Sequence, residues 1–132
     1  MKAEMQDTSN LHHMIAAAIE RLPAGNAAAR YQEGRWRLRD GALLHVDTAD
    51  DEILIALSMP ETHLDLQQLE QLLLLCGQGW PAPLAASLNA DETQALLFVR
   101  LEHADLEIER VCQAVLALHQ ARGRWLRPGA AR

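Results

Sequence analysis

The segment Arg35–Asp47 limits the possible folds more than any other part of the sequence. Apolar and basic side chains alternate through Arg35-Trp36-Arg37-Leu38-Arg39, and this period of two is typical of a half-buried β-strand. Asp40-Gly41 follows directly, and glycine tolerates the positive φ of a tight turn between antiparallel strands. Residues 42–47 supply the returning strand. A β-branched run over residues 52–57 extends this hairpin to a three-stranded meander.

Helical patterns lie on both sides of this meander. Residues 9–22 place apolar side chains three and four positions apart, which predicts an amphipathic helix. Residues 66–76 predict a short second helix that ends at Gly77, and the last helix is expected between Asp105 and Gly123. Two strands, 85–88 and 93–101, separate these last two helices. The order α-β-β-β-α-β-β-α predicts an α+β fold with an antiparallel five-stranded sheet and three helices.

The length and charge of the chain narrow its class. With 132 residues it has the size of one domain, which we expect over residues 1–123, followed by a basic tail over residues 124–132. Its net charge of −6 argues against nucleic-acid partners, because phosphate binding needs a basic surface. No apolar run reaches the length of a membrane span, and the first residues lack the apolar core of a secretory signal. We therefore expect a cytoplasmic protein.

Candidate catalytic groups are few and scattered. His12 and His13 are adjacent, so on a helix they point about 100° apart and do not form a metal-binding pair. The other histidines match no zinc spacing, and the two cysteines lie in apolar, helix-like stretches without metal or redox spacing. We expect no enzymatic activity, no cofactor and no metal. The alternative is a small enzyme or ligand-binding domain that uses His45 and His103, or a cysteine–histidine nucleophile pair.

The second predicted helix contains an anomaly, Leu72-Leu73-Leu74-Leu75. Four consecutive leucines point in directions spread around most of a helix, so at least two apolar surfaces must cover them. The sheet is one cover. The other is either a neighbouring helix of the same domain or the same helix of a second subunit in a two-fold contact, and we favour the second subunit. The expected dimer interface comprises Leu69, Leu72, Leu73, Leu75 and Trp80.

The order of elements, the acidic composition and the leucine-rich helix before Trp80 together resemble a class I type III secretion chaperone of the Tir-chaperone family. The resemblance covers roughly residues 9–122. It rests on the first hairpin at 39–46, the third strand at 53–57, the second helix at 69–75 and the final strand at 95–101. These are patterns of apolarity and order rather than catalytic motifs.

This resemblance implies a homodimeric bacterial cytoplasmic chaperone with a role in virulence and without ATPase activity. Such chaperones hold the N-terminal chaperone-binding segment of a secreted effector in extended form. They usually dimerise through the second helix and its neighbouring strand, and they offer apolar patches and sheet edges to the effector. The secretion ATPase is a further candidate partner, and an adaptor or regulator role in the secretion apparatus is the related alternative.

The candidate effector-binding residues come from the first helix and the first hairpin. An extended segment gains main-chain hydrogen bonds from a sheet edge and places alternate side chains in shallow apolar pockets. The chain has more apolar strand residues than one sheet face over a single helix readily covers, so some should remain available. The expected contacts are Leu11, Ile15, Trp36, Leu38, Leu43 and His45. Alternatively, each of these six residues is an ordinary core residue.

Overall fold

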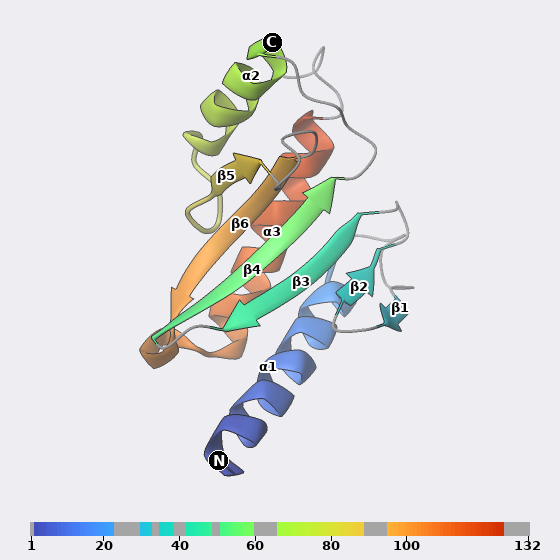
Figure 1. The fold of residues 1–132 in the computed structure, drawn as a ribbon, viewed down its shortest axis with the longest axis vertical. Coiled ribbons are helices and arrows are strands. Elements are labelled where there is room, and N and C mark those ends of the chain that lie inside the picture. The colour runs from blue at the N-terminus through green and yellow to red at the C-terminus, as the bar shows by residue number, and fades with distance from the viewer. Residues whose placement is uncertain are drawn as a thin grey trace.

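The computed structural model describes residues 2–22, 30–32, 35–38, 42–48, 51–59, 66–88 and 95–125. Most of them belong to three α-helices and a six-stranded sheet (Figure 1). The helices are α1 (Lys2–Glu20), α2 (Leu66–Cys76) and α3 (Ile108–Trp125), with a 3-10 turn, η1 (His103–Asp105), before α3. The strands are β1 (Arg30–Gln32), β2 (Arg35–Arg37), β3 (Leu43–Thr48), β4 (Glu52–Met59), β5 (Ala85–Leu88) and β6 (Ala95–Glu102).

The α+β class and the order of elements are confirmed. The three predicted helices and five predicted strands all occur in sequence order, and the short strand β1 is added at one edge of the sheet. Two helix boundaries differ from the prediction. α1 begins at Lys2 rather than residue 9, and α3 passes through Gly123 to Trp125. The last turn of α3 contains the buried residues Ala121 and Arg122, so tertiary packing overrides the glycine stop signal.

The strands follow the order β1-β2-β3-β4-β6-β5, and all neighbouring pairs are antiparallel. β4 therefore lies between β3 and β6, while α2 and β5 separate β4 from β6 in the sequence. The predicted Asp40-Gly41 turn lies outside the described residues. Beside it, the Leu38 N–H donates a hydrogen bond of 2.9 Å to the Ala42 carbonyl, which continues the β2–β3 pairing.

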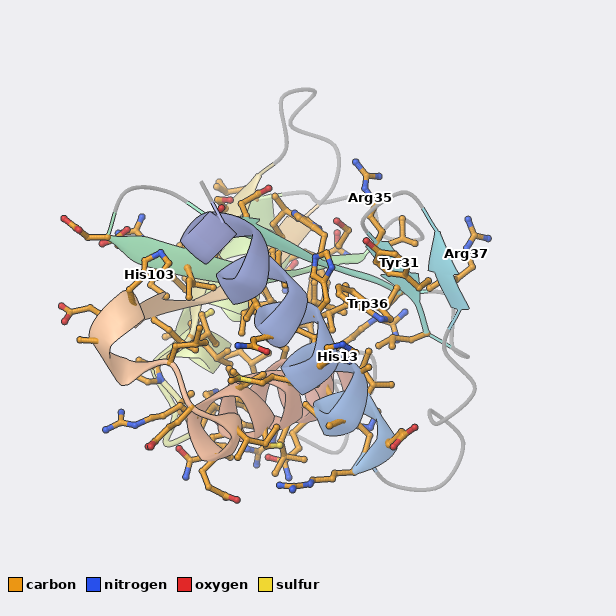
Figure 2. All side chains as sticks on the ribbon, turned by 90° about the horizontal axis from the view of Figure 1, so that it is seen from below. His13, Tyr31, Arg35, Trp36, Arg37 and His103 are labelled. Atoms are coloured by element: carbon orange, nitrogen blue, oxygen red, sulfur yellow. The ribbon has the colours of Figure 1, made fainter. Side chains whose placement is uncertain are left out.

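One face of the sheet forms the core. α1 and α3 pack against each other under this face, whereas α2 lies at one end of the sheet beside β5 and α3 (Figures 1 and 2). Alternate residues of a strand point to the same face, which places one set of apolar side chains against the helices. Those from the sheet that are at most 1% exposed and belong to this core are Leu44, Ile53, Ile55, Leu57, Leu97 and Val99.

Candidate partner-binding surfaces

The leucines of α2 divide into two sets. Leu72 and Leu75 belong to the core of the chain and are 0% and 5% exposed. In contrast, Leu66, Leu73 and Leu74 are 72%, 54% and 73% exposed. Helical positions seven and eight residues apart lie on the same side, so these three side chains line the exposed side of α2 around the exposed Glu70. We call Leu66, Leu73 and Leu74 the leucine stripe.

This division corrects part of the expected dimer interface. Leu72 and Leu75 are core residues with almost no side-chain surface for a second subunit to cover. Trp80 is half-buried, and its indole Nε1 donates a hydrogen bond of 2.7 Å to the Leu75 carbonyl at the end of α2. Leu73 remains exposed. The side chain of Leu69 lies outside the described part of the structure.

The expected effector-binding residues also divide into two sets. Four of them are at most 5% exposed and belong to the core, which leaves them little surface for a bound segment: Leu11, Ile15, Trp36 and Leu38. Strand register buries Trp36 and Leu38, because the β2 side that carries Trp36 faces α1 (Figure 2), and Leu11 and Ile15 lie on the buried side of α1. The other two, Leu43 and His45, lie on the opposite face of the sheet and are partly exposed.

Aromatic contacts explain why Trp36 is buried at the edge of the sheet. Its ring lies 5.4 Å from the His12 ring of α1 and 4.7 Å from the Tyr31 ring of β1, measured between centroids. Tyr31 pairs with Trp36 across the two strands and is itself 52% exposed. The added strand β1 thus extends the cover over Trp36, which the sequence patterns did not indicate.

None of the described helices packs on the second face of the sheet, which we call the open face. Strand pairing aligns its outward side chains in two rows across the sheet. One row contains Arg35, His45, Ala56, Phe98 and Ala85. The next contains Arg37, Leu43, Ser58, Leu96 and Ser87. Figure 2 shows Arg35 and Trp36 on opposite sides of the sheet, as this register requires.

His45 lies near the middle of the open face, and its pKa is lowered from the ordinary histidine value. Burial of the imidazole is the main cause, because the charged form loses hydration. The Asp47 carboxylate, with Oδ2 3.9 Å from Nε2, raises the pKa, and the Arg35 guanidinium lowers it. Within the described chain the buried Nδ1 atom has no hydrogen-bond partner. These effects favour a neutral imidazole at this position.

His45 and His103, the histidines of the enzymatic alternative, lie far apart in the structure. His45 pairs with Ala56 of β4, whereas the His103 N–H donates a hydrogen bond to the Asp51 carbonyl, just before β4 begins. Ala56 and Asp51 are five residues apart in extended chain, so the two histidines are separated by about 17 Å along the strands. The cysteine–histidine alternative also gains no support, because the pKa of the Cys76 thiol is raised by its burial.

The described ranges contain neither a metal-binding cluster nor a membrane-spanning helix. There, no group of three or more His, Cys, Asp and Glu side chains is arranged to hold a metal ion. None of the three described α-helices is both long enough and apolar enough to cross a bilayer.

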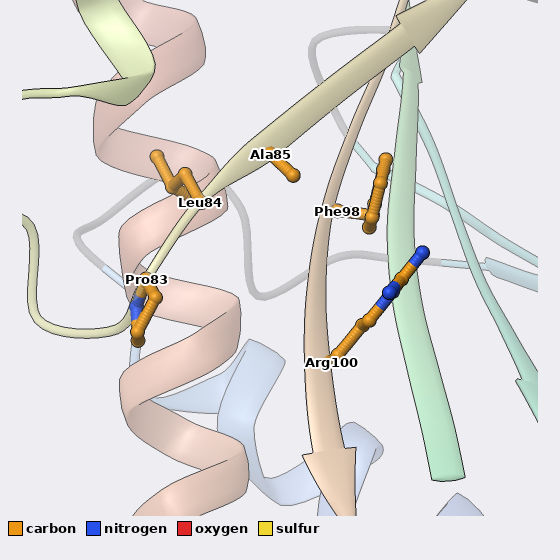
Figure 3. A pocket seen from close by; sticks show the side chains of 5 residues that line it. All are labelled: Pro83, Leu84, Ala85, Phe98 and Arg100. Atoms are coloured by element: carbon orange, nitrogen blue, oxygen red, sulfur yellow. The ribbon is translucent and has the colours of Figure 1, made fainter.

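A shallow pocket of about 290 Å³ lies on the open face, where the chain enters β5 beside β6 (Figure 3). Its lining comprises Pro83, Leu84, Ala85, Phe98 and Arg100. Phe98 and Arg100 project from the same side of β6, and the guanidinium carbon lies 5.6 Å from the ring centroid. The sequence analysis did not single out these two residues. The signal that would have found them is the alternation along β6, in which Leu97 and Val99 point inward.

Comparisons with protein-family models, with curated proteins and with solved structures give no match to this chain.

Proposed function

We propose that this protein is a homodimeric chaperone of the class I type III secretion kind, which holds the N-terminal segment of a secreted effector in extended form. The observation that carries this proposal is the leucine stripe of α2. Three large apolar side chains that are more than half exposed form one patch next to the terminal strand β5. Clustered exposed apolar side chains mark protein contacts more often than isolated ones do. A bacterial cytoplasmic location belongs to the same proposal.

The leucine stripe suits a two-fold contact because α2 is held firmly by the end of α3. The Arg124 guanidinium lies 5.8 Å from the Trp80 ring and donates a hydrogen bond of 2.7 Å to the Gln78 side chain. Trp80 in turn binds the last turn of α2 through the Leu75 carbonyl. A rigid helix loses little conformational entropy when a second copy covers its exposed side. We therefore place the dimer contact at Leu66, Leu73 and Leu74.

Two features support binding of an extended segment. β1 and β5 end the sheet, and no other described strand pairs with their outer edges. A free strand edge offers main-chain hydrogen bonds to an added strand. The open face adds partly exposed apolar side chains, among them Leu43, Leu54 and Leu96. Together the edges and the open face provide main-chain and side-chain contacts for one chain segment.

The dimer is tested by light scattering on Leu74→Asp. We expect the wild-type chain to show twice its 14.7 kDa mass at micromolar concentration. The variant should be a monomer with an unchanged circular dichroism spectrum, because a carboxylate is strongly unfavourable in an apolar contact. Gln71→Asp is the matched control, since Gln71 is exposed on the same helix outside the leucine stripe. A monomeric wild type, or a dimeric Leu74→Asp variant, contradicts the proposed interface.

The chaperone role is tested by co-purification from the native host, followed by mass spectrometry of the bound protein. We expect a secreted protein whose protease-protected fragment lies near its N-terminus and shows no folded structure of its own. A folded partner domain would favour the adaptor role, and a bound metabolite without a protein partner would favour the ligand-binding alternative.

A further inference from the structure

We infer that the pocket of Phe98 and Arg100 is an anchor site that selects an apolar side chain and a carboxylate two residues apart in an extended segment. This inference rests on the proposed function and specifies the chemistry of the bound segment. It concerns the open face, not the dimer contact on α2.

The apolar half of the anchor site is a side-chain pocket. Four of its five lining residues are apolar, and the Phe98 ring is half-buried. Its volume of about 290 Å³ lies at the lower limit for small-molecule sites, which is about 300 Å³. The pocket is also open to solvent along the sheet face. It therefore suits one aliphatic or aromatic side chain of a longer chain better than an enclosed metabolite.

The charged half is the guanidinium of Arg100, which is exposed. Among the described residues it forms no ion pair, although Glu102 follows two positions later on the same face. Its contact with the Phe98 ring leaves the N–H donors free for a planar anion. A carboxylate accepts two such N–H groups in a bidentate pair. Arg100 is thus poised for an acidic side chain at the edge of the pocket.

Among the described residues, the open face carries as many basic as acidic side chains. The whole chain carries a net charge of −6, yet the open face also displays the exposed Arg35 and Arg37 on β2. β2 and β6 are separated by β3 and β4, which is about 14 Å across the sheet, and Arg35 and Arg37 are also offset from Arg100 along the strands. The same face carries the exposed acids Asp47, Glu52 and Glu102, so the preference for a carboxylate rests on Arg100 itself and not on the charge of the whole face.

The spacing of the two halves sets the pattern of the bound segment. Phe98 and Arg100 are two residues apart on one strand, which is about 7 Å. In an extended peptide, side chains two positions apart point the same way at the same spacing. An apolar residue followed or preceded at the second position by Asp or Glu therefore meets both groups at once.

The experiment uses the full-length chain labelled with ¹⁵N and four acetylated, amidated peptides. The first is Ser-Thr-Leu-Ser-Asp-Thr-Ser. The second replaces Asp by Asn, the third replaces Leu by Ser, and the fourth places Leu and Asp next to each other. We expect the first peptide to shift the amide signals of Ala85, Phe98 and Arg100 in a saturable manner. The Asn peptide should bind about three- to fivefold more weakly, as expected for an exposed charge pair. The third and fourth peptides should also bind more weakly than the first.

Two variants assign this preference to Arg100. Arg100→Gln removes an exposed charge, so the fold should persist while the preference for Asp over Asn disappears. Arg37→Gln, an exposed arginine on the same face, should keep that preference and serves as the matched control. The inference is wrong if no saturable shift occurs at these amides, or if Arg100→Gln still prefers the Asp peptide.

The outcomes separate this inference from the proposed function. If the protein is a dimer that captures an effector but does not bind the peptides, the proposed function stands and the anchor site is contradicted. If the protein is a monomer that captures no secreted protein but selectively binds the first peptide, the anchor site stands and the proposed function is contradicted.

Discussion

The two faces of the sheet come from the same strands and differ in what covers them. On β4, Ile55 and Leu57 point toward the helices and are at most 1% exposed, whereas Leu54 points to the open face and is partly exposed. Both faces carry leucines, so hydrophobicity alone does not separate them. The two faces differ in the helices that cover them, because α1 and α3 pack on one face only. Apolar side chains on the covered face stabilise the fold, and the larger ones on the open face, such as Leu43, Leu54 and Leu96, stay partly exposed.

The difference between the covered and the open face is tested most strongly by truncating matched leucines of β4. We expect Leu57→Ala to lower the free energy of unfolding by about 2–5 kcal/mol, because it leaves a cavity in the packed core. Leu54→Ala should lower it by less than about 1.5 kcal/mol, since part of that side chain is already hydrated. Urea denaturation of both variants measures the difference. Equal losses would show that the open face is as well covered as the inner face.

Phe98→Ala measures how much the open face contributes to stability. A fully buried phenylalanine loses about 3–5 kcal/mol on truncation. Phe98 is half-buried, so we expect a loss of about 1–2 kcal/mol by urea denaturation. Phe98→Leu is the control that keeps most of the apolar contact. A loss as large as that of Leu57→Ala would remove the distinction between the faces.

The buried imidazole of His45 should make stability depend on pH. Its pKa is lower in the folded than in the unfolded chain, so between these two values the unfolded chain binds more protons. The free energy of unfolding should therefore fall as the pH drops below about 6.5 toward the lowered value. His45→Gln should flatten this part of the profile. An identical slope in both proteins would mean that His45 is hydrated like a surface residue.

The smallest effects concern the two charges beside His45. Asp47→Asn should lower the pKa of His45 further, and Arg35→Gln should raise it, because these groups act in opposite directions. Both changes should be smaller than the effect of burial, which is the main cause of the shift. An NMR pH titration of the His45 ring proton measures them. Shifts of the opposite sign would place these charges away from the imidazole.

The sequence predicted most of the fold because each element has a clear period. The alternation around Trp36 and the three- and four-residue spacing in the helices each define an element without knowledge of its neighbours. The alternation also showed that Trp36 and Leu38 share a face. It did not show that this face lies under α1, because one pattern fits either orientation of a strand.

The binding surfaces depend on information that is not local. The run Leu72–Leu75 correctly indicated more than one apolar side of α2, but the packing beside β5 and α3 decides which leucines remain outside. The pocket depends on the approach of residues 83–85 to β6, which only the pairing of β5 with β6 produces. Sequence patterns identified the leucine-rich helix and missed the anchor site for this reason.

The central pairing of β4 with β6 has a consequence for the order of folding. β3 and β4 are close in sequence, whereas Met59 and Ala95 pair only after the intervening chain has been looped out. Contacts across long loops form more slowly because the chain must first be closed. α3, which covers β4 and β6, is also the last of the described helices to be synthesised. A nascent chain that stops before Ile108 therefore lacks the helix that covers β4 and β6, and this part of the inner face stays bare until α3 has left the ribosome.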